Sequence, residues 1–173
     1  MFTLGRQMEK QHAASYVCSG ADRLVIGRVI DSAHDAIEGS ASADAVAQVF
    51  AEAFLTGGSG VWEQTGSWLC KLAGEHPSLA QLWLQLAPHK SARIRFRVAA
   101  FLNDMPDEIR QQLAATFLAD PSAKVRSKTA GEISTRPTAD VLPLLQSRIT
   151  QETDSEVLRA IQYALTAYTT TAD

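Results

Sequence analysis

The residues whose spacing best suits chemistry are Asp31, His34, Asp35 and Glu38. At i, i+3, i+4 and i+7 their side chains share one side of a helix, and two or three of them have the geometry to ligate a metal ion. The same spacing is typical of the solvent-exposed face of an amphipathic helix whose opposite side is apolar. We favour the solvent-exposed face and predict no metal site.

A glycine-rich stretch at 57–60 precedes a helical pattern, as phosphate-binding loops do. It lacks the preceding strand and the lysine of a P-loop, and it is not placed like a serine nucleophile elbow, so we interpret it as a turn. Cys18 and Cys70 have no histidine at ligand spacing, which argues against structural zinc or a disulfide framework. The sequence therefore predicts no catalytic residue, no metal ligand and no cofactor.

The composition is that of a folded domain: 173 residues, 46% hydrophobic and 20% charged, with a net charge of −3. This length predicts a single domain over 1–173. The slight acidity argues against a general nucleic-acid coat. A signal-peptide pattern and a run of about 18 apolar residues are both missing from the sequence, so we expect a cytoplasmic protein that has no membrane partner.

The elements that must position any site are helices, because apolar residues follow helical spacing almost throughout. The pattern predicts an all-α chain of about nine helices joined by short loops. Four prolines are interpreted as helix starts, since the first N–H groups of a helix have no intrahelical partner: Pro77, Pro106, Pro121 and Pro137. The predicted helices run from Leu24 up to Gly39, from Ser42 or Asp44 up to Gly57, and over 61–73, 77–86, 90–102, 106–118, 121–134, 137–149 and 154–168.

Similar apolar stripes recur with a period near 32 residues. Val61, Ile94, Val125 and Val157 each begin one, at separations of 33, 31 and 32 residues. Small residues follow within the first three stripes, such as the pair at 130–131, where close helix crossings require little side-chain volume, whereas Gln162 replaces the small residue in the last. A fixed period that contains two helices is the signature of a stacked α-solenoid.

The sharpest copy of the repeat is Asp-Pro-Ser-Ala-Lys-Val-Arg at 120–126, and it resembles the second helix of a HEAT repeat. The pattern is partly present at Ile94-Arg95, and in the last copy Asp154 stands one residue nearer to its valine. The resemblance covers roughly 60–168. It implies about four stacked antiparallel helix pairs in a right-handed superhelix, with 1–59 as divergent N-terminal helices or a cap.

The resemblance also implies a structural role for Asp120. In HEAT repeats the Asp and Arg commonly bond between neighbouring repeats, so Asp120 is expected to meet Arg95 or Arg126. Its position also suits an N-cap.

Charge is distributed unevenly along the chain. Residues 1–86 carry 5 basic and 9 acidic side chains, whereas 87–173 carry 11 and 10. The basic residues gather at 90–97 and 124–128, on helices that would stand side by side in a solenoid, and form either a solvated stabilising face or a binding ridge. The candidate binding residues are Lys90, Arg93, Arg95, Arg97, Lys124, Arg126, Lys128 and, beside the glycine loop, Trp62.

Two classes of function fit these features. The first is a non-catalytic protein-binding module that presents a charged, partly concave surface, as an adaptor or a bacterial immunity or inhibitor-type protein. The second is nucleic-acid binding, because the helix at 157–165 with Tyr168 resembles one in the HEAT-like alkylpurine DNA glycosylases. The chain lacks a recognisable Trp-Asp active-site segment, so we favour a protein partner over DNA.

Overall fold

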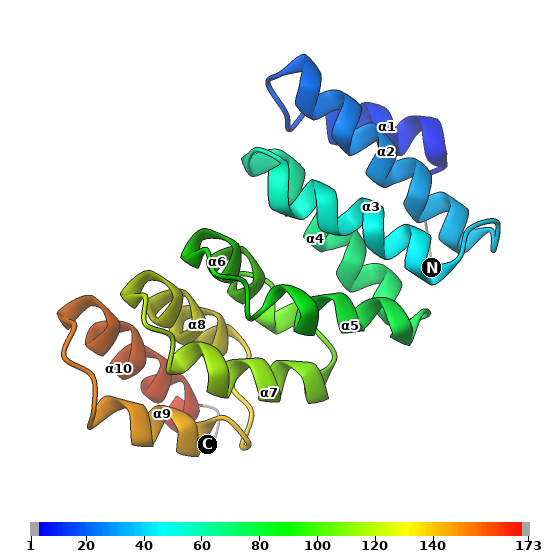
Figure 1. The fold of residues 1–173 in the computed structure, drawn as a ribbon. Helices are drawn as coiled ribbons and strands as arrows, with labels where there is room; N and C mark the ends of the chain where they lie inside the picture. The colour runs from blue at the N-terminus through cyan, green and yellow to red at the C-terminus, as the bar shows by residue number, and fades with distance from the viewer. Residues whose placement is uncertain (1–3, 171–173) are drawn as a thin grey trace. The chain divides into compact units, whose positions relative to one another are not determined.

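The computed structural model describes residues 4–170. Within that range the protein is all-α, with ten α-helices, one 3₁₀ helix and no strand (Figure 1). The helices are α1 (Arg6–Ala14), α2 (Gly20–Ile37), α3 (Ala43–Thr56), α4 (Ser59–Ala73), α5 (Pro77–Leu86), α6 (Ala92–Ala99), the 3₁₀ helix η1 (Leu102–Asp104), α7 (Asp107–Leu118), α8 (Ala123–Thr135), α9 (Leu142–Ile149) and α10 (Ser155–Thr170). The predicted all-α class is confirmed. None of the described helices combines the length and hydropathy needed to cross a bilayer.

Most predicted helix ends agree with local signals. The Ser42 hydroxyl caps α3 by accepting the N–H of Ala45 at 3.3 Å. Gly39 follows α2 with φ of 70°, the left-handed conformation that glycine adopts without strain. By contrast, the prediction that Pro137 begins a helix is wrong, because α9 begins at Leu142.

The segment 136–141 is held out of helical conformation by contacts from distant residues. Arg110 donates to the carbonyl of Arg136 at 2.5 Å and to the hydroxyl of Thr138 at 2.6 Å. The backbone N–H of Thr138 donates to the hydroxyl of Tyr168 at 3.2 Å. Pro137 therefore lies in a linker after α8.

The chain divides into two compact units, 1–83 and 84–173, and the boundary falls inside α5. In the first unit α2 is central, because it packs against α1, α3 and α4. Its apolar stripe of Ile26, Val29 and Ile30 is fully buried. The glycine loop at 57–60 lets α4 begin close to other backbone, since a Cβ on Gly60 would lie 2.2 Å from the carbonyl oxygen of Tyr16.

The second unit has two rows of helices. In one row α8 packs against both α6 and α10, and in the other α7 packs against α9 (Figure 1). The first residues of the predicted stripes, Ile94, Val125 and Val157, are buried beneath the α6, α8 and α10 row. This alternation is compatible with an α-solenoid, and the HEAT-like superhelix stays a prediction.

Candidate functional site

A groove opens along α8 because one side of this helix carries only small residues. Ala123, Ser127 and Gly131 recur every fourth position and so share a face. A Cβ added to Gly131 would meet nothing within 4 Å. The small residues at 130–131 were expected to permit close helix crossings, but only Ala130 is buried, and Gly131 instead leaves open space. The resulting groove has a volume of about 670 Å³.

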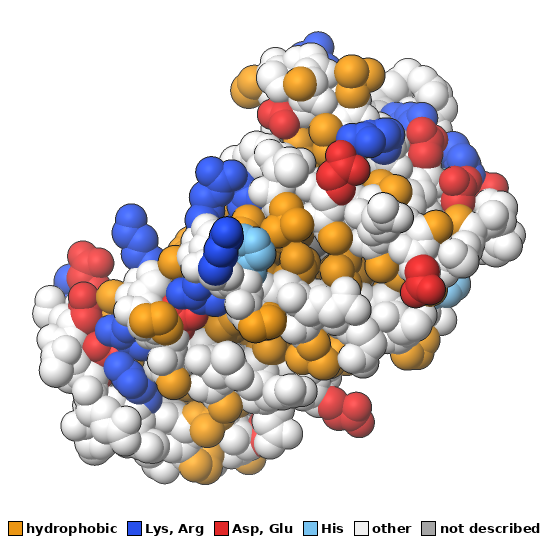
Figure 2. Space-filling view, viewed as in Figure 1, with side chains coloured by type: hydrophobic (Ala, Val, Ile, Leu, Met, Phe, Trp, Pro, Cys, Tyr) orange, Lys and Arg blue, Asp and Glu red, His pale blue; other side chains and the backbone are white. Residues whose placement is uncertain are grey.

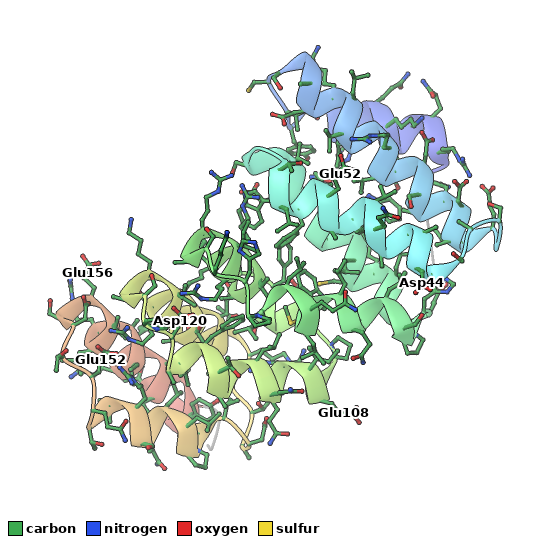
Figure 3. The ribbon with its side chains drawn as sticks, viewed as in Figure 1. Asp44, Glu52, Glu108, Asp120, Glu152 and Glu156 are labelled. Atoms are coloured by element: carbon green, nitrogen blue, oxygen red, sulfur yellow. The ribbon has the colours of Figure 1, made fainter. Side chains whose placement is uncertain are left out.

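The walls of the groove come from three helices. Phe96 of α6 stands on one side, half-buried, and Asp154, Glu156 and Val157 stand on the α10 side. The Asp154 carboxylate accepts the N–H groups of Glu156 and Val157 at 2.9 and 3.1 Å, which caps α10. Glu156 is labelled beside the start of α10 in Figure 3, and its side chain is exposed. The α10 wall is therefore acidic.

A second cavity of about 440 Å³ adjoins the groove and shares Phe96 and Lys124 with it. We call this cavity the Phe96 pocket; its lining residues are Ala92, Arg93, Phe96, Ser122 and Lys124. Figure 2 shows Lys and Arg side chains gathered over this part of the second unit, with hydrophobic side chains between them. The charged residues that line the Phe96 pocket are both cations.

Two buried ion pairs fix the helices that carry the groove. Arg95 donates to both carboxylate oxygens of Asp120, at 2.6 and 2.9 Å, and Arg126 donates to both carboxylate oxygens of Glu152, at 2.7 and 2.8 Å. Each arginine also binds the carbonyls five and six residues before it, so the same hydrogen-bond pattern occurs twice, 31 residues apart. Figure 3 labels Asp120 and Glu152 in the α8–α10 region.

The expected contact of Asp120 with Arg95 is confirmed, whereas its expected N-cap role is wrong. Ser122 occupies the N-cap of α8, and Asp120 accepts the N–H of Ser122 at 2.8 Å. In the following repeat Glu152 makes the same contacts as Asp120, because it binds Arg126 and accepts the N–H two residues on, and Asp154 in addition caps α10.

The ion pairs keep both carboxyl groups charged. Burial by itself raises the pKa of Asp120, but Arg95, the Ser122 N–H and Arg126 together bring it below the ordinary value. Hydrogen bonds from Arg126 above all hold the pKa of Glu152 far below its usual range, and Arg148 and two backbone N–H groups add to the effect. Both residues therefore act as permanent anions at neutral pH.

The seven basic candidates do not all face outward. Arg95 and Arg126 are held in the ion pairs, and Arg97 is only 4% exposed. Burial, then the charge of Arg93, lowers the pKa of Arg97.

The remaining basic candidates lie on the surface of α6 and α8 and in the loop before α6. Lys128 is half-buried and pairs with Glu132 at 2.6 Å. Lys90, Arg93 and Lys124 are exposed, and among the residues that the structure describes their side chains form no hydrogen bond or ion pair. Of these, Arg93 and Lys124 line the Phe96 pocket, and Lys124 and Lys128 line the groove.

Trp62 lies in the other unit, half-buried, with its ring edge-on to Phe54 at 6.1 Å between centroids. It contributes nothing to the groove, which residues 84–173 build by themselves.

The three acidic residues among the four with metal-ligand spacing, at the C-terminal part of α2 and just after it, hold α1 through ion pairs. Arg6 binds Asp35 at 2.7 Å and Glu38 at 3.0 Å, and Lys10 binds Asp31 at 2.5 Å. His34 is turned the other way, only 5% exposed and 5.9 Å from the Trp68 ring. The expectation of a wholly solvent-exposed face is therefore wrong for His34. Across residues 4–170 no group of three or more potential ligands is placed to hold a metal ion.

Sequence reasoning missed Phe96, Ser127 and the acidic wall of the groove. Phe96 and Ser127 occupy the same position of the repeat, two residues after Ile94 and Val125. The change from a large to a small residue at that position was visible in the sequence, and it is what opens the groove.

No protein-family model matches the chain, and a search of curated proteins found no match either.

Proposed function

We propose that the protein is a non-catalytic, HEAT-like binding module whose groove across α6, α8 and α10 receives a protein partner. The observation that carries this proposal is the opening of about 670 Å³ above Ser127 and Gly131, on a surface that also holds an aromatic side chain. Protein interfaces combine an apolar, often aromatic centre with a charged rim, and this groove offers both.

The charges of the groove favour protein over DNA. A nucleic-acid backbone requires cations along its whole path, because phosphate neutralisation supplies most of the affinity. Here Glu132, Asp154 and Glu156 line the groove beside Lys124 and Lys128. A surface of mixed sign suits a protein segment of complementary pattern.

The ion pairs beneath the groove support a rigid binding surface. Arg95 and Arg126 tie α6 and α8 to the loops before them and to carboxylates 25 and 26 residues on, so binding needs little reordering of the site. An adaptor or an immunity-type inhibitor in the cytoplasm would use such a surface.

Blocking the groove tests this function. We expect Ser127→Trp to weaken capture of the partner from native extract at least tenfold, because the indole would fill the groove floor. The matched control is Gln112→Trp, at an exposed position of α7 on the other row. Equal capture by both variants, with wild-type melting temperatures, would refute a partner site in the groove.

A further inference from the structure

We propose that the Phe96 pocket binds an acidic peptide segment, with an apolar side chain against Phe96 and carboxylates over Arg93 and Lys124. This inference deepens the proposed function and rests on it. It names the chemistry of the partner at one end of the groove.

The pocket is apolar at its centre and cationic at its rim. Phe96 lines the pocket together with Ala92 of α6 and Ser122 before α8, and a space of about 440 Å³ lies beside these residues. When a short peptide binds such a pocket, burial of its one apolar side chain against the ring contributes most of the binding affinity.

The rim cations differ from three other basic residues of α6 and α8. Arg95, Arg126 and Lys128 are each paired with a carboxylate. Arg93 and Lys124 have no such partner among residues 4–170. Two unpaired cations beside an apolar surface attract a carboxylate, which gains charge-assisted hydrogen bonds on arrival.

Arg93 also lies near a second positive charge. Its charge contributes to the lowered pKa of Arg97, so the two guanidinium groups repel one another. An anion at the rim would be attracted by both Arg93 and Lys124, which line the pocket.

The opposite end of the groove limits where an acidic segment can lie. Asp154 and Glu156 line the α10 wall and would repel a carboxylate there. The acidic part of the partner is thus confined to the α6–α8 end.

The test uses the full chain labelled with ¹⁵N and three capped pentapeptides. The first has a central Phe with two Glu on each side, the second replaces the Glu by Lys, and the third replaces the Phe by Ser. We expect only the first to shift the amide signals of 92–96 and 122–124 strongly, with an affinity about tenfold or more above the other two.

Charge reversal supplies the variant. Arg93→Glu combined with Lys124→Glu should weaken the acidic peptide at least tenfold. The control, Arg23→Glu with Arg159→Glu, changes the net charge equally at exposed positions outside the pocket and should leave affinity within about twofold.

Three outcomes would overturn the acidic assignment. One is a Lys peptide that binds as well as the Glu peptide, and another is no shift at 92–96 and 122–124 at millimolar peptide. The third is an oligothymidylate that binds these residues more tightly than the Glu peptide, which would indicate nucleic acid. The first two outcomes do not affect the capture experiment with Ser127→Trp. A failure of the acidic-peptide proposal is therefore distinguishable from a failure of the proposed function.

Discussion

The Glu152→Ala protein will lose about 3–5 kcal/mol of unfolding free energy in residues 84–173. The Glu152 side chain is fully buried and accepts hydrogen bonds from Arg126, Arg148 and the N–H groups of Thr153 and Asp154. Its removal takes away the carboxylate that binds the Arg126 guanidinium directly, itself 11% exposed, and leaves only the longer-range charges of Asp154 and Asp120. A buried charge that loses its direct partner costs more than the pair contributes, which is why the loss is large.

Hydrogen exchange of the α8 and α10 amides measures this loss in residues 84–173. Tryptophan fluorescence would not report it, because all three tryptophans lie in 1–83. The matched control is Glu156→Ala, an exposed carboxylate at the start of α10, which should change stability by less than about 0.5 kcal/mol. Equal protection in the two variants would show that the ion pair does not hold this unit together.

The same carboxylate makes the unit sensitive to acid. The pKa of Glu152 is lowered in the folded state, so its stabilisation is complete above the unfolded pKa near 4.3 and is lost as the pH falls below it. Glu152→Gln removes this titration. We expect a shallower fall in stability below about pH 4 for Glu152→Gln than for wild type, and parallel curves would contradict the assignment.

The Gly60→Ala protein will lose about 1–3 kcal/mol of stability in residues 1–83. The added methyl would lie 2.2 Å from the Tyr16 carbonyl oxygen, and this atom belongs to backbone that cannot rotate aside. The start of α4 must then move away from the segment between α1 and α2.

Tryptophan fluorescence reports this unit, and Gly27→Ala is the matched control. Gly27 lies inside α2, where a Cβ would meet nothing within 4 Å, so alanine should raise stability by about 0.5–1 kcal/mol. A Gly60→Ala protein as stable as Gly27→Ala would mean that the close approach to Tyr16 is not required.

Local periodicity was enough to predict the helical class and most helix positions. The apolar stripes at Ile94, Val125 and Val157 are buried as their spacing indicates. Helix α1 was missed because its residues are mainly polar, and Arg6 and Lys10 attach it to α2 through ion pairs. Such ion pairs join residues that are about 20 to 30 positions apart in the sequence, so they produce no helical periodicity by which the helix could be predicted.

The candidate site was predicted only in part, for a related reason. Spacing placed most of the basic residues on α6 and α8, but the directions of Arg95 and Arg126 depend on carboxylates 25 and 26 residues away. Glu152 stands 32 residues after Asp120, as Val157 does after Val125, so the second ion pair had a sequence signal that the nearer Asp154 obscured.

We propose that a protein partner lies in the groove across α6, α8 and α10. The most direct test of this proposal is a photo-crosslinking amino acid at position 128, beside the groove, compared with the same group at position 112 on α7. This proposal predicts a discrete, nuclease-resistant protein adduct from position 128 in native extract and none from position 112. Adducts of equal yield from both positions, or an adduct from position 128 that nuclease removes, would contradict it.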